Sequence, residues 1–142
     1  MKEASAGIVP YRLDRGKRKY LLLRTRPLKG EFWEFPKGWI EEGETLLDTA
    51  KREFSEETGI PDCEIIPGFQ KVIRYFYRRE GKLISKTVTY FLGQVKAGRV
   101  KISNESQGFA WMDFEEAKSN LTIKNLRDLL LEAERFLETR TD

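Results

Sequence analysis

The sequence predicts an α+β fold in which helices cover a mixed β-sheet. Two observations lead to this prediction. Several runs rich in Ile, Val, Thr, Tyr and Phe have the length of strands, and other stretches carry apolar residues at helical spacing. These elements follow the order strands, helix, strands, helix, which is typical of a sheet with helices packed on it. With 142 residues, 39% of them hydrophobic and 35% charged, we expect one globular domain over residues 1–142.

The N-terminal part predicts two strands. Residues 4–13 have strand character, although Pro10 favours a sheet edge or a bulge because proline lacks an N–H group. A polar turn over residues 14–19 leads into the apolar run 20–25, which has strand length. Residues 27–37 are expected to form a loop.

A helix is predicted after this loop. Thr45 is expected to cap its N-terminus, and Asp48 three residues later completes an approximate capping box. Gly59 supplies a C-terminal stop. The apolar residues that share one face of the helix are Leu47, Ala50 and Phe54.

The C-terminal half predicts a hairpin, a strand and two helices. The expected elements are strands 63–77 and 83–95 around a glycine-containing turn at 78–82, strand 108–113, and helices 114–120 and 123–139. In the last helix an apolar stripe repeats at helical spacing, which indicates a core-facing side rather than a partner site. Its residues are Leu126, Leu130, Ala133 and Leu137.

Composition excludes several kinds of protein. The chain contains no histidine, which excludes a Ser-His-Asp or Cys-His nucleophilic site, a histidine base and a histidine-ligated zinc. The single Cys63 cannot form an internal disulfide. Because no apolar run reaches the roughly 20 residues of a membrane span and no signal peptide is visible, we expect a cytoplasmic protein without a membrane partner. The net charge of +3 does not call for bulk nucleic-acid binding.

Three carboxylates crowd one side of the predicted helix. Glu53, Glu56 and Glu57 stand at i, i+3 and i+4 and therefore fall within roughly 100° of arc. Such close like charges repel, so a compensating partner is expected. One interpretation is a solvated acidic face offset by Lys51 and Arg52. The preceding loop, rich in glycine and glutamate, favours the other interpretation, a site for Mg²⁺, which takes oxygen ligands and binds phosphate oxygens.

The spacing over residues 38–60 resembles the Nudix box. In order, the segment has Gly38, five residues, Glu44, seven residues, and then Arg-Glu-Phe-Ser-Glu-Glu-Thr-Gly-Ile. It matches every defined position of the box, although Phe54 is aromatic where an aliphatic residue is usual. The Ala-Gly-Ile-Val start, the Phe-Pro-Lys-Gly entry and the C-terminal helix fit the same family. The resemblance implies a Nudix-type α/β/α sandwich with a mixed β-sheet, a catalytic loop–helix and a C-terminal helix.

The resemblance also implies roles for the residues of the box. The implied metal ligands are Glu53, Glu56, Glu57 and the Gly38 carbonyl, and the implied ion is Mg²⁺, with Mn²⁺ as the alternative. Glu56, Glu57 and Arg52 would act in catalysis. Arg52 would also pair with Glu44 to orient loop and helix, and Gly59 would end the helix. The implied reaction is attack by water on a phosphorus of a substituted nucleoside diphosphate.

Segments 35–44, 85–92 and 103–111 further resemble asymmetrical diadenosine tetraphosphate hydrolases. That resemblance implies that Glu105, in the loop before the last strand, acts as a base or extra metal ligand; the alternative is an ordinary loop carboxylate. Lys37 and Lys86 match basic positions that would hold the polyphosphate.

Three tyrosines are candidates for stacking an adenine. Tyr75, Tyr77 and Tyr90 lie in predicted strands, and aromatic faces bind bases with little hydrogen-bond readout. The alternative is that they simply pack. Strand alternation places Tyr75 and Tyr77 on the same side.

The expected function is metal-dependent cleavage of diadenosine tetraphosphate to ATP and AMP. The alternatives are another substrate of the same family (a damaged nucleoside triphosphate, ADP-ribose or an RNA 5′ end) and a non-catalytic nucleotide-binding or RNA-binding module. The expected partner is a small nucleoside polyphosphate. The sequence leaves open whether the protein is a monomer or a homodimer.

Overall fold

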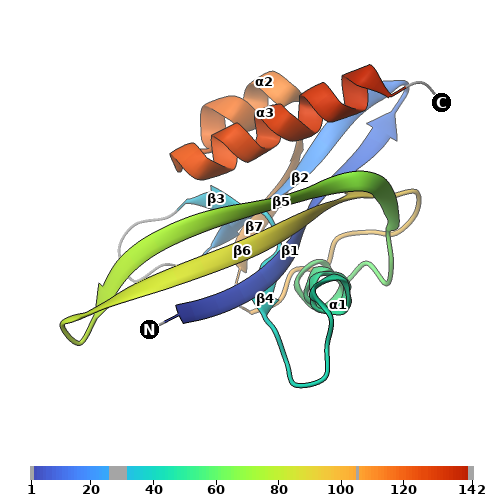
Figure 1. Cartoon of the computed structure of the whole chain (residues 1–142). Coiled ribbons are helices and arrows are strands. Elements are labelled where there is room, and N and C mark those ends of the chain that lie inside the picture. The colour runs from blue at the N-terminus through green and yellow to red at the C-terminus, as the bar shows by residue number, and fades with distance from the viewer. Residues whose placement is uncertain (1, 26–31, 105, 141–142) are drawn as a thin grey trace.

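A computed structural model describes residues 2–25, 32–104 and 106–140 of the chain (Figure 1). Within these residues, the elements follow the expected order of strands, a helix, strands and helices. Their bounds are β1 Lys2–Asp14, β2 Lys17–Thr25, β3 Trp33–Glu34, β4 Lys37–Trp39, α1 Leu46–Thr58, β5 Glu64–Arg79, β6 Lys82–Gln94, β7 Ser106–Met112, α2 Phe114–Asn120 and α3 Lys124–Thr139. Glu105 lies outside the described residues.

The strands form a mixed sheet, which confirms the predicted fold class. The order of strands is β3-β2-β1-β6-β5, with β4 paired to β1 and β7 paired to β2. The pairing of β1 with β6 is parallel, and the other pairings are antiparallel. One edge of β1 is shared, because its first half pairs with β4 and its last residues pair with β2. This division of the sheet leaves β4 beside the first half of β1.

Pro10 lies in β1, an interior strand, and not at the sheet edge that its missing N–H group favours. The Ile8 N–H donates to the Pro36 carbonyl at 3.1 Å, so the same edge of β1 faces the start of β4. Residues two apart in a strand direct their N–H groups to the same edge, so Pro10 also faces that side. Pro10 falls between the part of β1 that pairs with β4, which ends at Gly7, and the part that pairs with β2, which begins at Tyr11. Neither pairing on this edge needs an N–H group at Pro10, so the interior strand accommodates the proline.

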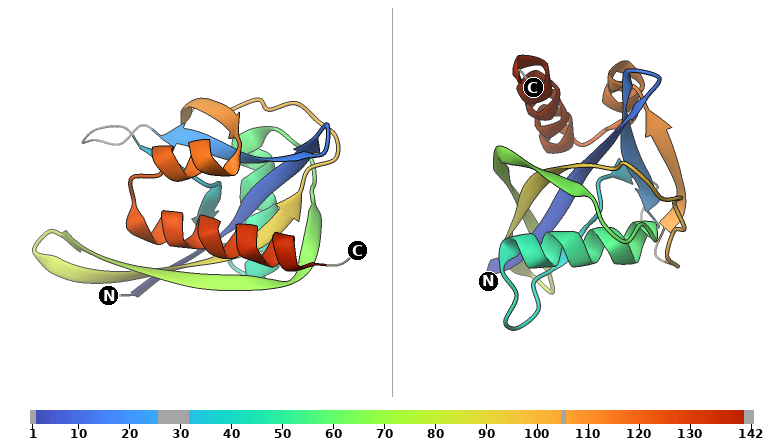
Figure 2. Two further views of the ribbon diagram at one scale, coloured as in Figure 1. Left: turned by 90° about the horizontal axis from the view of Figure 1, so that it is seen from above. Right: turned by 90° about the vertical axis from the view of Figure 1, so that its right-hand side faces the viewer.

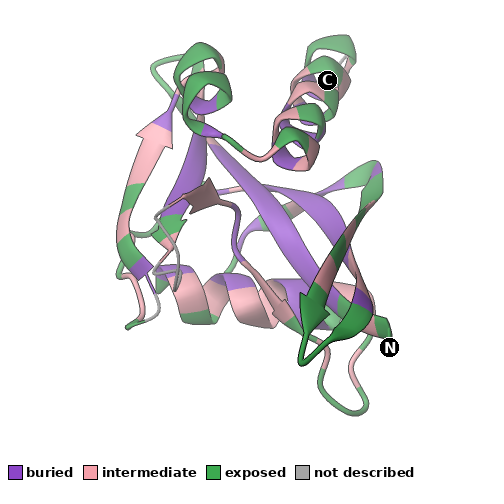
Figure 3. Cartoon of the chain, turned by 90° about the vertical axis from the view of Figure 1, so that its left-hand side faces the viewer, coloured by how far each residue is buried: buried purple, intermediate pink, exposed green. Residues whose placement is uncertain are grey.

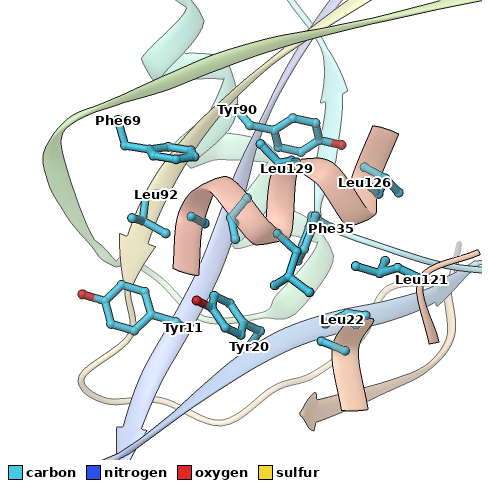
Figure 4. Close-up of a cluster of buried hydrophobic side chains, with 14 of the residues drawn as sticks. Tyr11, Tyr20, Leu22, Phe35, Phe69, Tyr90, Leu92, Leu121, Leu126 and Leu129 are labelled. Atoms are coloured by element: carbon cyan, nitrogen blue, oxygen red, sulfur yellow. The ribbon is translucent and has the colours of Figure 1, made fainter. Parts of the chain in front are cut away.

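Helices cover both faces of the sheet. Alternate residues of β1 point to opposite sides: Val9 and Tyr11 join the cluster that includes α3 residues, whereas Ala6 and Ile8 join the cluster that includes α1 residues. Figure 2 shows α1 on one side of the sheet and α2 with α3 on the other. The larger cluster, with its aromatic and leucine side chains, is drawn in Figure 4. The central strands are correspondingly buried (Figure 3). The expected sandwich is confirmed.

The predicted ends of α1 are confirmed. The Thr45 hydroxyl accepts a hydrogen bond from the Asp48 N–H at 3.0 Å, and the Asp48 carboxylate accepts one from the Thr45 N–H at 3.1 Å. Gly59 caps the other end with a φ of 74°, a left-handed conformation that glycine adopts without strain. The α3 stripe is also confirmed, since all four of its predicted core residues are buried.

Two parts of the chain differ from the prediction. The described part of the expected loop 27–37 contains β3 and the start of β4, strands too short to show an alternating pattern. The hairpin of β5 and β6 is longer than expected, because only Glu80 and Gly81 form its turn. Their φ values of 52° and 77° are both positive, as a two-residue hairpin turn requires. None of the helices in the described residues is long and apolar enough to cross a membrane.

Candidate active site

The box residues line a cleft of about 720 Å³. Its walls come from β2, β3, β4, α1, β6 and the segment that leads into β7. The sequence-predicted residues that line it are Lys37, Gly38, Arg52, Glu53, Glu56, Glu57 and Lys86. Sheet pairing positions β4 against β1, and α1 packs on the same strands, so residues far apart in the sequence meet here.

Arg52 joins the acidic loop to the helix. Its Nε and Nη2 atoms lie 2.6 and 3.0 Å from the two carboxylate oxygens of Glu44, so the expected ion pair is present and is bidentate. Nη2 also donates to the Trp39 carbonyl at 2.9 Å. Nη1 lies 3.2 Å from carboxylate oxygens of both Glu53 and Glu56. One guanidinium therefore fixes β4, the loop and the glutamate face of α1.

Glu44 is held by several donors. Besides Arg52, the Glu41 N–H donates to it at 2.9 Å and the Thr49 hydroxyl at 2.8 Å. These interactions, with Arg52 first and the Glu41 N–H next, lower the pKa of Glu44 to about 2. Glu44 is therefore ionised at neutral pH and keeps the loop folded over the start of α1.

Position 38 requires glycine because the Glu53 carboxylate leaves no room for a side chain there, and not because of the backbone conformation. A Cβ atom at this position would lie 2.0 Å from Cδ and 2.1 Å from Oε1 of Glu53. Real Cβ contacts are longer than 3.0 Å, so any side chain at residue 38 would displace the Glu53 carboxylate. Glycine thus lets the carboxylate lie directly on the β4 backbone, where the side chain of Glu53 is only 15% exposed.

Glu57 is a buried carboxylate. Burial, and next the negative charge of Glu53, raise the pKa of Glu57 to about 8. The Lys37 N–H donates to its Oε2 atom at 3.3 Å. Without a bound cation, Glu57 therefore holds its proton near neutral pH, which relieves the repulsion expected between the clustered glutamates.

The donor set fits a hard divalent cation. It consists of oxygen atoms only, as Mg²⁺ prefers, and a cation would replace the Glu57 proton. Within residues 2–25, 32–104 and 106–140, no three acidic or cysteine side chains are already grouped as a metal site. Glu53 and Glu56 instead face Arg52. The predicted ligands therefore share one cleft but would have to reorient around an ion.

The two predicted polyphosphate lysines both reach the cleft. The Lys37 Nζ lies 3.1 Å from the Glu34 carboxylate. The Lys86 Nζ lies 5.0 Å from the centroid of the Trp39 ring. Burial, and next the charge of Lys37, lower the pKa of Lys86. Two cationic groups thus share a partly buried space, an environment suited to a polyanion.

The prediction that Tyr90 stacks a base is corrected by the structure. Tyr90 is 0% exposed, and its ring packs edge-on against Phe35 with centroids 6.2 Å apart (Figure 4). A ring enclosed by the core cannot receive an adenine. The alternative interpretation, packing, holds for this residue.

Tyr75 and Tyr77 lie on the same side of β5, as alternation predicts, and both are half-buried. Tyr75 packs against the larger core cluster, and burial raises its pKa to about 12. The Tyr77 hydroxyl donates to Glu3 in β1. Neither tyrosine lines the cleft, and their contact with a base stays a prediction.

Sequence reasoning did not name several residues that line the cleft, and two of them lie beside the predicted ones. Glu34 and Trp39 both line it, and Trp39 is 52% exposed. Both flank Lys37 and Gly38 in sequence. Their proximity to the Phe-Pro-Lys-Gly entry is the signal that would have found them.

Comparisons with known proteins agree with this geometry. The NUDIX domain model matches residues 1–133. A mouse asymmetrical bis(5′-nucleosyl)-tetraphosphatase is 39% identical over 109 residues, which cover 74% of this chain and 71% of that protein. A Caenorhabditis elegans protein of the same name is 31% identical over 134 residues and covers 94% and 95% of the two chains. A crystal structure of a C. elegans Ap4A hydrolase binary complex superposes with a TM-score of 0.86 at 30% identity, covering 97% and 99%.

The box spacing, the sandwich fold and the match of the family model lead to one conclusion. The chain belongs to the NUDIX family of hydrolases.

Proposed function

We propose that this protein cleaves diadenosine tetraphosphate asymmetrically, to ATP and AMP, with a divalent cation as cofactor. One observation carries the proposal: the glutamate face of α1 and the two lysines line the same cleft. That cleft therefore combines ligands for a cation with charges for a polyphosphate. The relatives named as tetraphosphatases support the choice of substrate. Mg²⁺ is the proposed ion and Mn²⁺ the alternative.

In the proposed reaction, the oxygen of a water molecule forms a bond to phosphorus and the bridging P–O bond breaks. The electron pair of that bond leaves on the departing nucleotide, and the water loses a proton. The cation held by the box glutamates and the Gly38 carbonyl would polarise the phosphate and lower the pKa of the water. Glu105 is the proposed base for the water proton, as the family resemblance implies.

The remaining residues of the cleft bind and position. Lys37 and Lys86 would hold the phosphates, since each ammonium group offers donors to phosphate oxygens. Arg52, held by Glu44, keeps Glu53 and Glu56 beside the cleft. It therefore acts on the glutamates that bind the ion. The cytoplasmic location expected from the sequence stays a prediction.

Product analysis tests this proposal. Purified protein is mixed with diadenosine tetraphosphate and Mg²⁺, and the products are resolved by chromatography. Equal amounts of ATP and AMP are expected. Two molecules of ADP, or no turnover, would contradict the proposal.

A substrate panel tests selectivity in the same assay. It contains an oxidised nucleoside triphosphate, ADP-ribose and a 5′-triphosphorylated RNA. The box supplies the chemistry for each of them, whereas the flanking strands set selectivity. The proposal expects the highest kcat/KM for the dinucleoside tetraphosphate, and a higher value for any other member would reassign the substrate.

A further inference from the structure

Trp39 is a large aromatic side chain left open within a charged cleft. The residue is 52% exposed, although most large apolar residues of the described chain are buried. It lines the cleft together with Lys37, Lys86 and the glutamates of α1. An exposed ring in such surroundings is a candidate for a ligand contact, because the two lysines proposed to hold phosphate line the same cleft.

The backbone of Trp39 is hydrogen-bonded to Arg52 of the box and to β1. Its carbonyl accepts a hydrogen bond from Arg52 Nη2 at 2.9 Å, and it pairs with Ser5 across the β1–β4 ladder. The Cβ position of the preceding Gly38 faces Glu53. Strand alternation then directs the Trp39 side chain to the other side of β4, where the Lys86 Nζ lies 5.0 Å from the ring centroid. The backbone of Trp39 is therefore fixed relative to the glutamates, and its ring lies beside Lys86.

We propose that Trp39 is a stacking platform for the base of a nucleotide whose phosphates are held by Lys37 and Lys86. This inference rests on the proposed function for the substrate class, a nucleoside polyphosphate. Tyr90, a predicted stacking residue, is enclosed in the core, whereas Trp39 offers an exposed indole in the cleft itself. Lys86 lies beside both the ring and the phosphate-binding space, so base and phosphate would be recognised together.

Stacking on an indole makes a defined prediction about selectivity. The contact uses the face of the base and not its hydrogen-bonding edge, so adenine and guanine should both be accepted. Larger purine rings should bind better than pyrimidines. The contribution of the base should also be separable from that of the phosphates, which interact with lysine.

The test measures binding of ATP and of inorganic tripolyphosphate, each with Mg²⁺, by calorimetry. The two ligands share a triphosphate, and only ATP has a base. For Trp39→Ala we expect ATP affinity to fall about 10-fold, within the range for loss of one stacked base, and tripolyphosphate affinity to stay unchanged. Trp39→Phe, which keeps an aromatic face, should recover most of the loss. The matched control is Phe76→Ala, which removes another exposed aromatic ring (63% exposed) that does not line the cleft.

Fluorescence gives an independent readout. The chain has three tryptophans, and we expect ATP, but not tripolyphosphate, to quench the emission of the wild-type protein. Trp39→Phe should remove most of the quenching while ATP still binds. Quenching that persists in this variant would place the base elsewhere and overturn the proposal.

Three further results would overturn it. Trp39→Ala could weaken both ligands equally, which would show that the ring acts through Lys86 or the fold. It could weaken neither, which would make Trp39 an exposed residue without a ligand. Wild-type protein could bind ATP no more tightly than tripolyphosphate.

The failure of this inference can be distinguished from the failure of the proposed function. Cleavage of diadenosine tetraphosphate with an unchanged KM in Trp39→Ala refutes only stacking. Base-dependent ATP binding without cleavage refutes only the assigned reaction.

Discussion

Gly38→Ala is expected to disable the site while leaving the fold intact. The added Cβ would lie 2.0 Å from the Cδ of Glu53, whereas ordinary contacts begin at 3.4 Å, so the carboxylate must move by about 1.4 Å. A displacement of about 1 Å at a catalytic group costs on the order of 100-fold in rate. We therefore expect kcat/KM for diadenosine tetraphosphate to fall by about 100-fold or more. Gly38 has no positive φ, so backbone strain is not part of the effect.

Gly108→Ala is the matched control. A Cβ at Gly108 meets nothing within 4 Å and its φ is not positive, so the same substitution adds a methyl group without a clash. Steady-state kinetics and thermal unfolding are measured on both variants. Wild-type kcat/KM in Gly38→Ala would refute the steric argument. A large fall in melting temperature for Gly38→Ala would show that the loss of activity reflects unfolding.

Two other substitutions test separate parts of the structure. The pKa of Glu44 is lowered to about 2 against an ordinary value of 4.5, so the stability it contributes is present above pH 4.5 and is lost as the pH falls toward 2. Glu44→Gln should therefore flatten the pH dependence of urea unfolding in that window, and an unchanged slope would contradict the ion pair with Arg52. Tyr90→Phe removes a buried hydroxyl that has no hydrogen-bond partner among the described residues, so stability should stay equal or rise by about 1 kcal/mol, with kcat unchanged. A loss of more than about 1 kcal/mol would reveal a partner for that hydroxyl.

Local signals in the sequence predicted much of the fold. The ends of α1 follow from Thr45 and Gly59, whose preferences act within one turn of helix. The stripe of α3 follows from spacing alone, because a helix that covers a sheet must bury one side. Helical spacing also predicted that the box glutamates lie together on one side of α1.

The remaining features depend on contacts between distant segments. Tyr90 and Tyr75 lie in neighbouring strands and look alike in sequence, yet Tyr90 packs against Phe35 in the core and only Tyr75 is part-exposed. Whether a strand tyrosine is open depends on what covers that side of the sheet. The short strands β3 and β4 form because partners in β2 and β1 accept them, so their own residues show little pattern. The exposure of Trp39 could not be predicted either, because Trp39 belongs to β4 and its surroundings depend on how that strand pairs.

The most direct test of the central claim is the metal dependence of the box glutamates. Hydrolysis of diadenosine tetraphosphate is measured for wild type, Glu56→Gln, Glu57→Gln and the control Glu132→Gln. Glu132 is half exposed on α3, where it pairs with Lys71 away from the cleft. If the box binds the catalytic cation, Glu56→Gln and Glu57→Gln lose most activity and a chelator abolishes wild-type turnover, while Glu132→Gln matches wild type. Wild-type turnover in both box variants, or turnover that survives the chelator, would contradict the account.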